Sequence, residues 1–225
     1  METNILYEDD HMLVVEKSAI IPSYMEGTEG EELLKALKEH IKKSDAESDD
    51  LYPEADEVLE SPIGGAAVFA KTAETASHLS QELENSRVKR KYRAIVRGKM
   101  PRAEDTLTDH LLKNTENNLF SITGEDNEKA IKGVLHYKVI DRDETNDLTL
   151  MEIEMEKGYS YHIRVQLANV GNVLHGDTNY GQHYNKVGQP IALWSYEVNV
   201  EHPDKDETVT VESTPPDEIP WNTFY

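Results

Sequence analysis

The chain has 225 residues, enough for one large domain or two small ones with a buried core, and it contains no cysteine, which excludes disulfides, thiol nucleophiles and cysteine metal sites. Its 44 acidic residues outnumber 23 basic ones, giving a formal net charge of −21, so nonspecific nucleic-acid binding should be weak. No stretch approaches the length of a membrane span and the N-terminus lacks a signal-peptide layout, so we expect a cytoplasmic protein without a membrane partner.

The first half of the chain predicts short strands and two amphipathic helices. In chain order we expect strands at 4–7 and 11–17, a helix at 30–44, an acidic loop at 45–57, a buried strand at 65–71 and a helix at 72–86. The first helix has leucines and an isoleucine at helical spacing, with acids at its start and lysines at its end, as the helix dipole favours. Thr72 is an expected N-cap for the second helix.

The second half is rich in strands. We expect them at 88–98, 118–123, 133–141, 147–156, 194–201 and 207–213, with one short helix at 163–171 that ends at Gly171. Helices are few and do not alternate regularly with strands, which indicates an α+β class with a mostly antiparallel sheet. No low-complexity linker interrupts the chain, so we predict a single domain over residues 1–225.

Basic residues gather in one segment of this acidic chain. Five of the seven arginines lie between residues 87 and 102. The candidates for contact with nucleic acid are Arg87, Lys89, Arg90, Lys91 and Arg93. The alternative is a solvated strand edge that charge protects from pairing with other chains.

Patterns typical of metal or phosphate sites are absent from the sequence. The nine histidines are scattered, and no HxxxH or HxH pair accompanies a carboxylate in the manner of a metal site. Gly64-Gly65 has neither the GxxxxGK nor the GxGxxG context of a phosphate-binding loop. We therefore expect no metal and no nucleotide cofactor.

Five segments, in order along nearly the whole chain, resemble the RluA-type family of RNA pseudouridine synthases. They are ILYEDDHMLVVEKSA, GGAAVFAKTAETASHLSQEL, VKRKYRAIVRG, KGYSYHIRVQLANVGNVLHGDTNYG and ALWSYEVNVEHPDKDETVTVESTPP. The resemblance implies a catalytic domain with a bent, mostly antiparallel central sheet. Matched to the family in this way, the chain begins at the catalytic domain, so we expect no N-terminal S4-type RNA-binding domain.

The resemblance also implies a reaction and its residues. Such enzymes detach uracil from ribose at N1, rotate the base and rejoin it through C5, without cofactor or metal, on uridines of ribosomal or transfer RNA. The target base leaves the stack to reach the site. The family tyrosine that packs against the base falls on Tyr92, and the arginine that pairs with the essential aspartate falls on Arg164. Asp177, in the family's glycine-aspartate turn, is expected to hold a loop.

The active-site motif departs from the family. Aligning GGAAVFAKT with the family's SGLLVFAKT places EVLE on the HRLD motif, so the histidine becomes Glu57, the arginine Val58 and the essential aspartate Glu60. Glu60 is still a carboxylate, able to attack carbon or move a proton. Its extra methylene displaces the oxygens by about an ångström, and a misplacement of that size can cost roughly 100-fold in rate. The motif therefore predicts impaired activity.

Three functions remain open from the sequence. The first is a pseudouridine synthase that uses Glu60, which a basic cleft leading to Glu60 would favour. The second is a non-catalytic descendant that binds RNA or protein, which a blocked or acidic cleft would favour. The third is an enzyme acting on a free nucleoside or nucleotide, which a small closed pocket over Tyr92 would favour.

Overall fold

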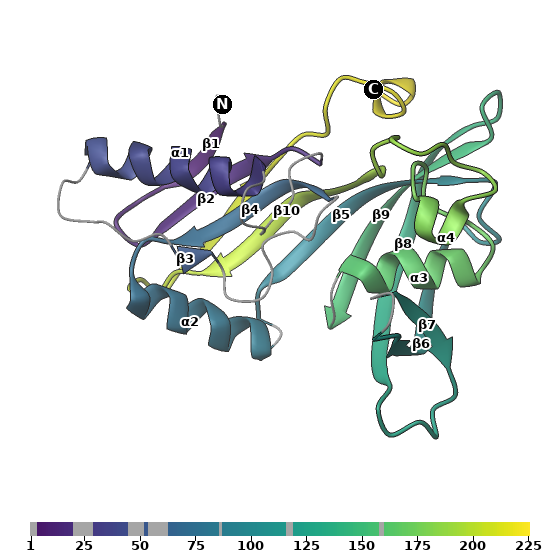
Figure 1. Cartoon of the computed structure of the whole chain (residues 1–225), viewed down its shortest axis with the longest axis horizontal. Coiled ribbons are helices and arrows are strands. Elements are labelled where there is room, and N and C mark those ends of the chain that lie inside the picture. Colours follow the sequence, from purple (N-terminus) through teal and green to yellow (C-terminus); the bar gives the residue numbers. More distant parts are fainter. Residues whose placement is uncertain are drawn as a thin grey trace. The chain divides into compact units, whose positions relative to one another are not determined.

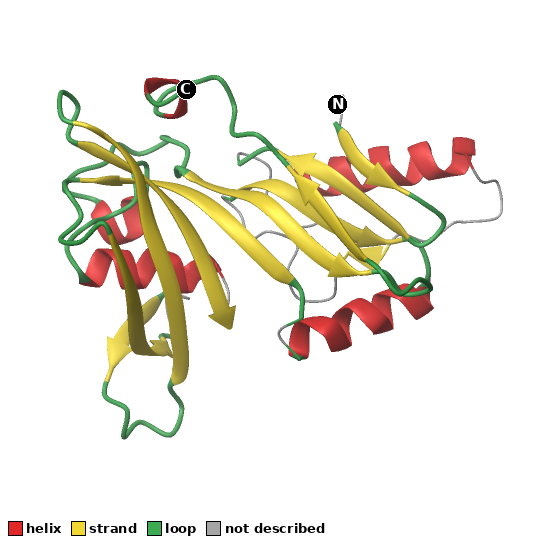
Figure 2. Ribbon diagram, turned by 180° about the vertical axis from the view of Figure 1, so that it is seen from behind, coloured by secondary structure: helices red, strands yellow, loops and turns green. Residues whose placement is uncertain are grey.

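The computed structural model describes residues 4–19, 29–44, 52–53, 63–85, 87–115, 119–157 and 160–225. The chain divides into two compact units, the first formed by residues 1–90 and 195–214 and the second by residues 91–194 and 215–225. Most neighbouring strands in each of them are antiparallel (Figures 1 and 2). No helix among the described residues is long and apolar enough to cross a membrane.

The first unit is a sheet covered by two helices. Its neighbouring strands run in the order β1 (Ile5–Glu8), β2 (Met12–Lys17), β4 (Gly64–Ala70), β10 (Leu193–Glu201) and β11 (Thr208–Glu212), with β3 (Tyr52–Pro53) also paired to β4. The helices are α1 (Glu29–Ser44) and α2 (Ala73–Glu84), which lie on opposite sides of these strands (Figure 1).

The burial of β4 on both of its faces explains why its sequence is a continuous apolar run. All seven β4 residues are buried, because helices cover the strands on both sides. One core cluster joins Leu79 of α2 to Val14, Val68 and Val198 of three neighbouring strands. The N-cap predicted for α2 is confirmed, since the Thr72 side chain accepts a hydrogen bond from the Thr75 backbone N–H at 3.1 Å.

The second unit is a five-stranded antiparallel sheet with one main helix. The strand order is β5 (Lys89–Arg97), β9 (Leu148–Lys157), β8 (Ile131–Asp143), β6 (Glu104–Lys113) and β7 (Phe120–Thr123). Helix α3 (Ser160–Asn169) packs on β6, β7 and β8, and the short α4 (Thr178–Gly181) follows it. A single turn of 3-10 helix, Trp221–Thr223, lies near the C-terminus.

An apolar cluster joins α3 to the β6–β7 hairpin. Leu111, Phe120 and Val165 are buried there. The rings of Phe120 and Tyr161 stack with centroids 3.7 Å apart and an interplanar angle of 10°. This stack fixes the N-terminal turn of α3, and with it the segment that carries Arg164.

The α+β class and the mostly antiparallel pairing predicted from the sequence are confirmed. Strand β6 is absent from the prediction. Its α3-facing side carries Asp109, which accepts hydrogen bonds from the side-chain amides of Gln166 and Asn169, so the expected alternation of apolar and polar residues is broken. Within the acidic segment predicted as a loop, Tyr52 and Pro53 form β3. The single-domain organisation stays a prediction.

Candidate active site

The structure describes two of the three predicted active-site residues. Tyr92 lies in β5 and Arg164 in α3, both in the second unit. Glu60 lies outside the described residues, together with Glu57 and Val58. The predicted meeting of Glu60 with Tyr92 and Arg164 in one cleft therefore stays a prediction.

Tyr92 lies on the sheet face that α3 covers. Its side chain is 4% exposed, and it stands opposite Ile153 of β9, which stands opposite Tyr137 of β8. Gly133 is on the same face of β8, because side chains alternate along a strand. A Cβ at Gly133 would meet the Gln166 side chain of α3 at 3.2 Å, so the helix approaches the sheet closely there. Tyr92 and the helix that carries Arg164 thus share one side of the sheet.

Arg164 is held by Asp177. Its Nε donates to Asp177 Oδ2 at 2.8 Å and its Nη2 to Oδ1 at 2.9 Å, a two-point ion pair. The side chains are 11% and 1% exposed, so water screens the pair little. The guanidinium carbon also lies 5.4 Å from the centre of the Tyr180 ring, a cation–π distance. The orientation of Arg164 is therefore set by two neighbouring side chains.

Asp177 is fixed in turn by its loop. Its carboxylate accepts hydrogen bonds from the backbone N–H groups of Asn179 and Tyr180, and so caps α4. Asp177 thus holds a loop, and it also supplies the partner of Arg164. Gly176 before it has φ +83°, and a Cβ there would lie 2.0 Å from the Pro190 carbonyl oxygen, so only glycine fits this turn.

Asn185 ties this turn to β5 and was not predicted from the sequence. Its Oδ1 accepts hydrogen bonds from Arg97 Nε at 2.7 Å and from the Gly176 N–H at 3.0 Å. Its Nδ2 donates to the carbonyl oxygens of Leu174 and Asp177, both at 2.9 Å. All four hydrogen-bonding positions of the amide are used. A lone asparagine in a polar loop gives no sequence signal of such a role.

His175 lies in the same turn and is shielded from water. Burial, with a smaller contribution from the positive charge of Arg97, lowers the pKa of His175 to about 4. Its buried Nδ1 has no hydrogen-bond partner among the described residues. A neutral imidazole at physiological pH suits a packing role better than proton transfer.

The predicted RNA-binding cluster is divided between the two faces of β5. Arg90 is buried, and its guanidinium donates to the Ala66 carbonyl oxygen at 3.2 Å. Lys91 and Arg93 lie on the face opposite Tyr92, within 3.8 and 3.1 Å of carboxylate oxygens of β9. Arg87 contacts Glu82 at 3.0 Å, and Lys89 is exposed. RNA contact by these five residues stays a prediction.

The carboxylate partners of Lys91 and Arg93 belong to two rows of polar side chains. The β-ladder register aligns the rows across four strands, β6, β8, β9 and β5. The rows are Thr106–His136–Glu154–Lys91 and Glu104–Lys138–Glu152–Arg93. In the second row, negative and positive side chains alternate.

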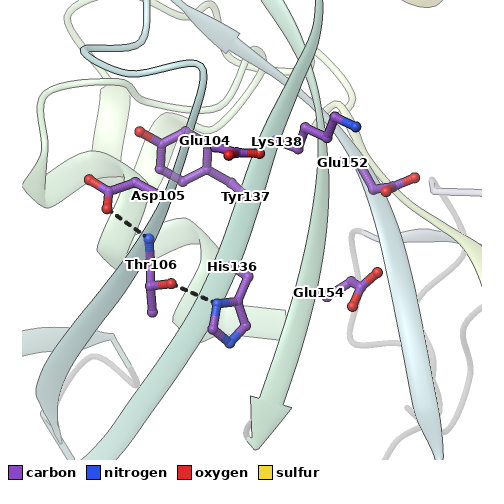
Figure 3. Close-up of a pocket in the computed structure, with 8 residues that line it drawn as sticks. All are labelled: Glu104, Asp105, Thr106, His136, Tyr137, Lys138, Glu152 and Glu154. Atoms are coloured by element: carbon purple, nitrogen blue, oxygen red, sulfur yellow. Dashed lines mark hydrogen bonds between the residues drawn. The ribbon is translucent and has the colours of Figure 1, made fainter.

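A cavity of about 430 Å³ adjoins these rows (Figure 3). Four carboxylates line it, those of Glu104, Asp105, Glu152 and Glu154, with Lys138 as the single lysine. Such a lining repels phosphate. No group of three or more His, Asp or Glu side chains in the described ranges could hold a metal ion.

The comparison with protein families identifies the chain. The family model for RNA pseudouridylate synthase matches residues 11–169. This chain belongs to that family. The Bacillus subtilis protein YhcT, named as an uncharacterized RNA pseudouridine synthase, is 30% identical over 214 residues, which cover 94% of this chain and 68% of YhcT.

Further relatives agree with the RluA-type assignment, which is confirmed. The ribosomal large subunit pseudouridine synthase D of Neisseria meningitidis serogroup A is 28% identical over 233 residues, covering 97% of this chain and 60% of that protein. The human RNA Pseudouridylate Synthase Domain Containing 4 has the same fold, with a TM-score of 0.76 over 95% of this chain and 88% of the human chain, at 16% identity.

Proposed function

We propose that this chain binds ribosomal or transfer RNA in the cytoplasm and isomerises uridine to pseudouridine only poorly. The observation that carries the proposal is the sequence EVLE at the position of the family's HRLD motif, which places Glu60 where the essential aspartate stands. The family membership supplies the reaction type, and the altered motif supplies the expected loss of rate.

Two separate defects follow from the motif. The longer Glu60 side chain moves the carboxylate by about an ångström, which can cost roughly 100-fold in rate. Val58 replaces a cationic side chain that would contact RNA phosphate or fill the space left by the extruded base. Extruding a base costs a few kcal/mol, and an apolar valine offers no compensating charge.

The retained parts of the site support a synthase origin. Arg164 keeps a fixed orientation through Asp177, and Tyr92 keeps a buried position on the same side of the sheet as α3. We propose that Arg164 also directs charge toward Glu60, and that Tyr92 lies against the target base.

Tritium release from RNA that contains 5-tritiated uridine tests the proposal, because forming the C5 bond expels that hydrogen. We expect little release from the unmodified protein and from Glu60→Asp alone. The triple variant Glu57→His, Val58→Arg and Glu60→Asp should release at least about ten times more tritium, since it restores both the position of the carboxylate and the cationic side chain of the motif. Glu125→Asp, the same shortening at an exposed site, is the matched control. Rapid release by the unmodified protein would refute the impairment.

A non-catalytic RNA-binding role is the second candidate, favoured by the loss of both the histidine and the arginine from the motif. It predicts RNA binding without tritium release, even from the triple variant. Release from free 5-tritiated uridine or its monophosphate, but not from RNA, would instead indicate an enzyme of free nucleosides or nucleotides.

A further inference from the structure

One tract of the second unit is nearly free of acidic residues. Residues 160–194 contain a single one, Asp177, whereas an even spread of the 44 acidic residues would place about seven there. Asp177 is buried and its charge is matched by Arg164. This tract therefore adds almost no negative charge to the surface of a chain whose net charge is −21.

The tract exposes a loop of mixed aromatic and basic character, residues 182–190. Tyr184 is 66% exposed and Val187 95% exposed, and both belong to the few large hydrophobic side chains that face water. His183 and Lys186 are exposed beside them. Within the described ranges, no carboxylate lies within salt-bridge distance of the Lys186 amine.

The loop is anchored at several points. The buried Asn185 binds the Asp177 turn and Arg97 with all four hydrogen-bonding positions of its amide. The Tyr184 N–H donates to the Gly181 carbonyl oxygen at 2.9 Å, and the Lys186 N–H to Gln189 Oε1 at 2.7 Å. A ring presented by an ordered loop loses less entropy on binding than one on a loose segment.

We propose that loop 182–190 is an RNA-contact surface on which the Tyr184 ring stacks against an unpaired base and the Lys186 amine contacts a phosphate. An exposed tyrosine ring can stack on any base, and a neighbouring cation can contact the phosphate backbone of the RNA. RNA fits better than an acidic or basic protein partner, because the loop combines one unpaired cation with an aromatic ring and no acid. The choice of RNA rests on the proposed function, whereas the loop's role does not depend on Glu60.

The test is the affinity of the full chain for a fluorescent RNA stem-loop with an unpaired uridine-rich loop, measured by anisotropy at several salt concentrations. Tyr184→Ala should weaken binding about tenfold, and Tyr184→Phe, which keeps the ring, should bind like the unmodified chain. Tyr225→Ala is the matched control, because Tyr225 is 67% exposed in the same unit.

Lys186→Ala should reduce the slope of log affinity against log salt by about 0.7, the value for one phosphate of a single strand. Its control is Lys205→Ala, because Lys205 is exposed and lies 3.4 Å from a Glu207 oxygen.

The outcomes separate this proposal from the proposed function. If the unmodified chain binds RNA and Tyr184→Ala binds equally well, the loop proposal is overturned while RNA binding stands. If the unmodified chain binds no RNA, both are overturned. A change in self-association by Tyr184→Ala, seen by sedimentation without a change in RNA affinity, would make the loop a protein interface and overturn the RNA contact.

Discussion

Breaking the ion pair between Arg164 and Asp177 should destabilise the chain strongly. Removing one member of a buried ion pair costs about 3–5 kcal/mol, because the other charge stays buried. Arg164 keeps 11% exposure and the Tyr180 ring, so the lower value applies and Asp177→Asn should cost about 3 kcal/mol. Asparagine preserves the oxygen that caps α4. Asp177→Ala removes that cap as well and should cost about 1 kcal/mol more.

Urea unfolding of the single and double alanine variants of this pair measures the coupling energy directly. We expect about 2–3 kcal/mol, since the geometry is two-point and largely shielded from water. The control cycle is Arg102 with Asp105, an ion pair at 3.0 Å whose side chains are 70% and 30% exposed, for which we expect under about 0.5 kcal/mol. A coupling energy for Arg164 and Asp177 no larger than that of the control would refute the reasoning.

Two further predictions concern stability. The pKa of His175 is lowered to about 4 in the folded chain, from the ordinary 6.5 of an unfolded one. Between these two pH values the unfolded chain binds a proton that the folded chain does not. The free energy of unfolding should therefore fall by about 2 kcal/mol from pH 7 to pH 4.5. His175→Gln should flatten that part of the pH profile in urea unfolding, whereas His183→Gln at an exposed site should not. If the two variants gave equal pH profiles, the pH dependence could not be attributed to His175. Gly65→Ala should destabilise the fold by at least about 2 kcal/mol more than Gly171→Ala in the same assay. Both glycines have positive φ, but a Cβ at Gly65 would lie 2.2 Å from the Ser195 carbonyl oxygen and one at Gly171 meets nothing within 4 Å, so equal losses would show that the clash is relieved.

Local signals in the sequence predicted the elements whose stability is local. The helix at 72–86 could be located because Thr72 is a capping residue next to an amphipathic run, and α2 begins directly after it. The buried strand predicted at 65–71 could be located because every residue of β4, Gly64–Ala70, is small or apolar. Strand β6 was not predicted because its inward-facing Asp109 is stabilised by Gln166, a residue 57 positions away in the sequence. No local pattern contains that pairing.

The candidate site likewise combines residues that a local motif predicts with contacts that only the folded chain forms. The family motif located Tyr92 and Arg164, but the partner of Arg164 depends on a turn that Asn185 fixes from outside the motif. The basic cluster around β5 illustrates the limit most clearly. Which carboxylates approach Lys91 and Arg93 depends on the register between β5 and β9, and register is a property of the folded sheet.

This arrangement of charge reconciles an acidic chain with an RNA-binding family. Lys91 and Arg93 lie on the face opposite Tyr92 and have Glu154 and Glu152 beside them, so much of the conspicuous basic charge of β5 is matched within the sheet. Repulsion from distant acids is screened beyond about 8 Å at physiological salt, so the composition of the nearest surface decides whether a phosphate can approach. Residues 160–194 hold one acid, and Arg164 matches it. Under the proposed function, the favourable approach for RNA in the second unit is therefore along loop 182–190, which contains no acidic residue.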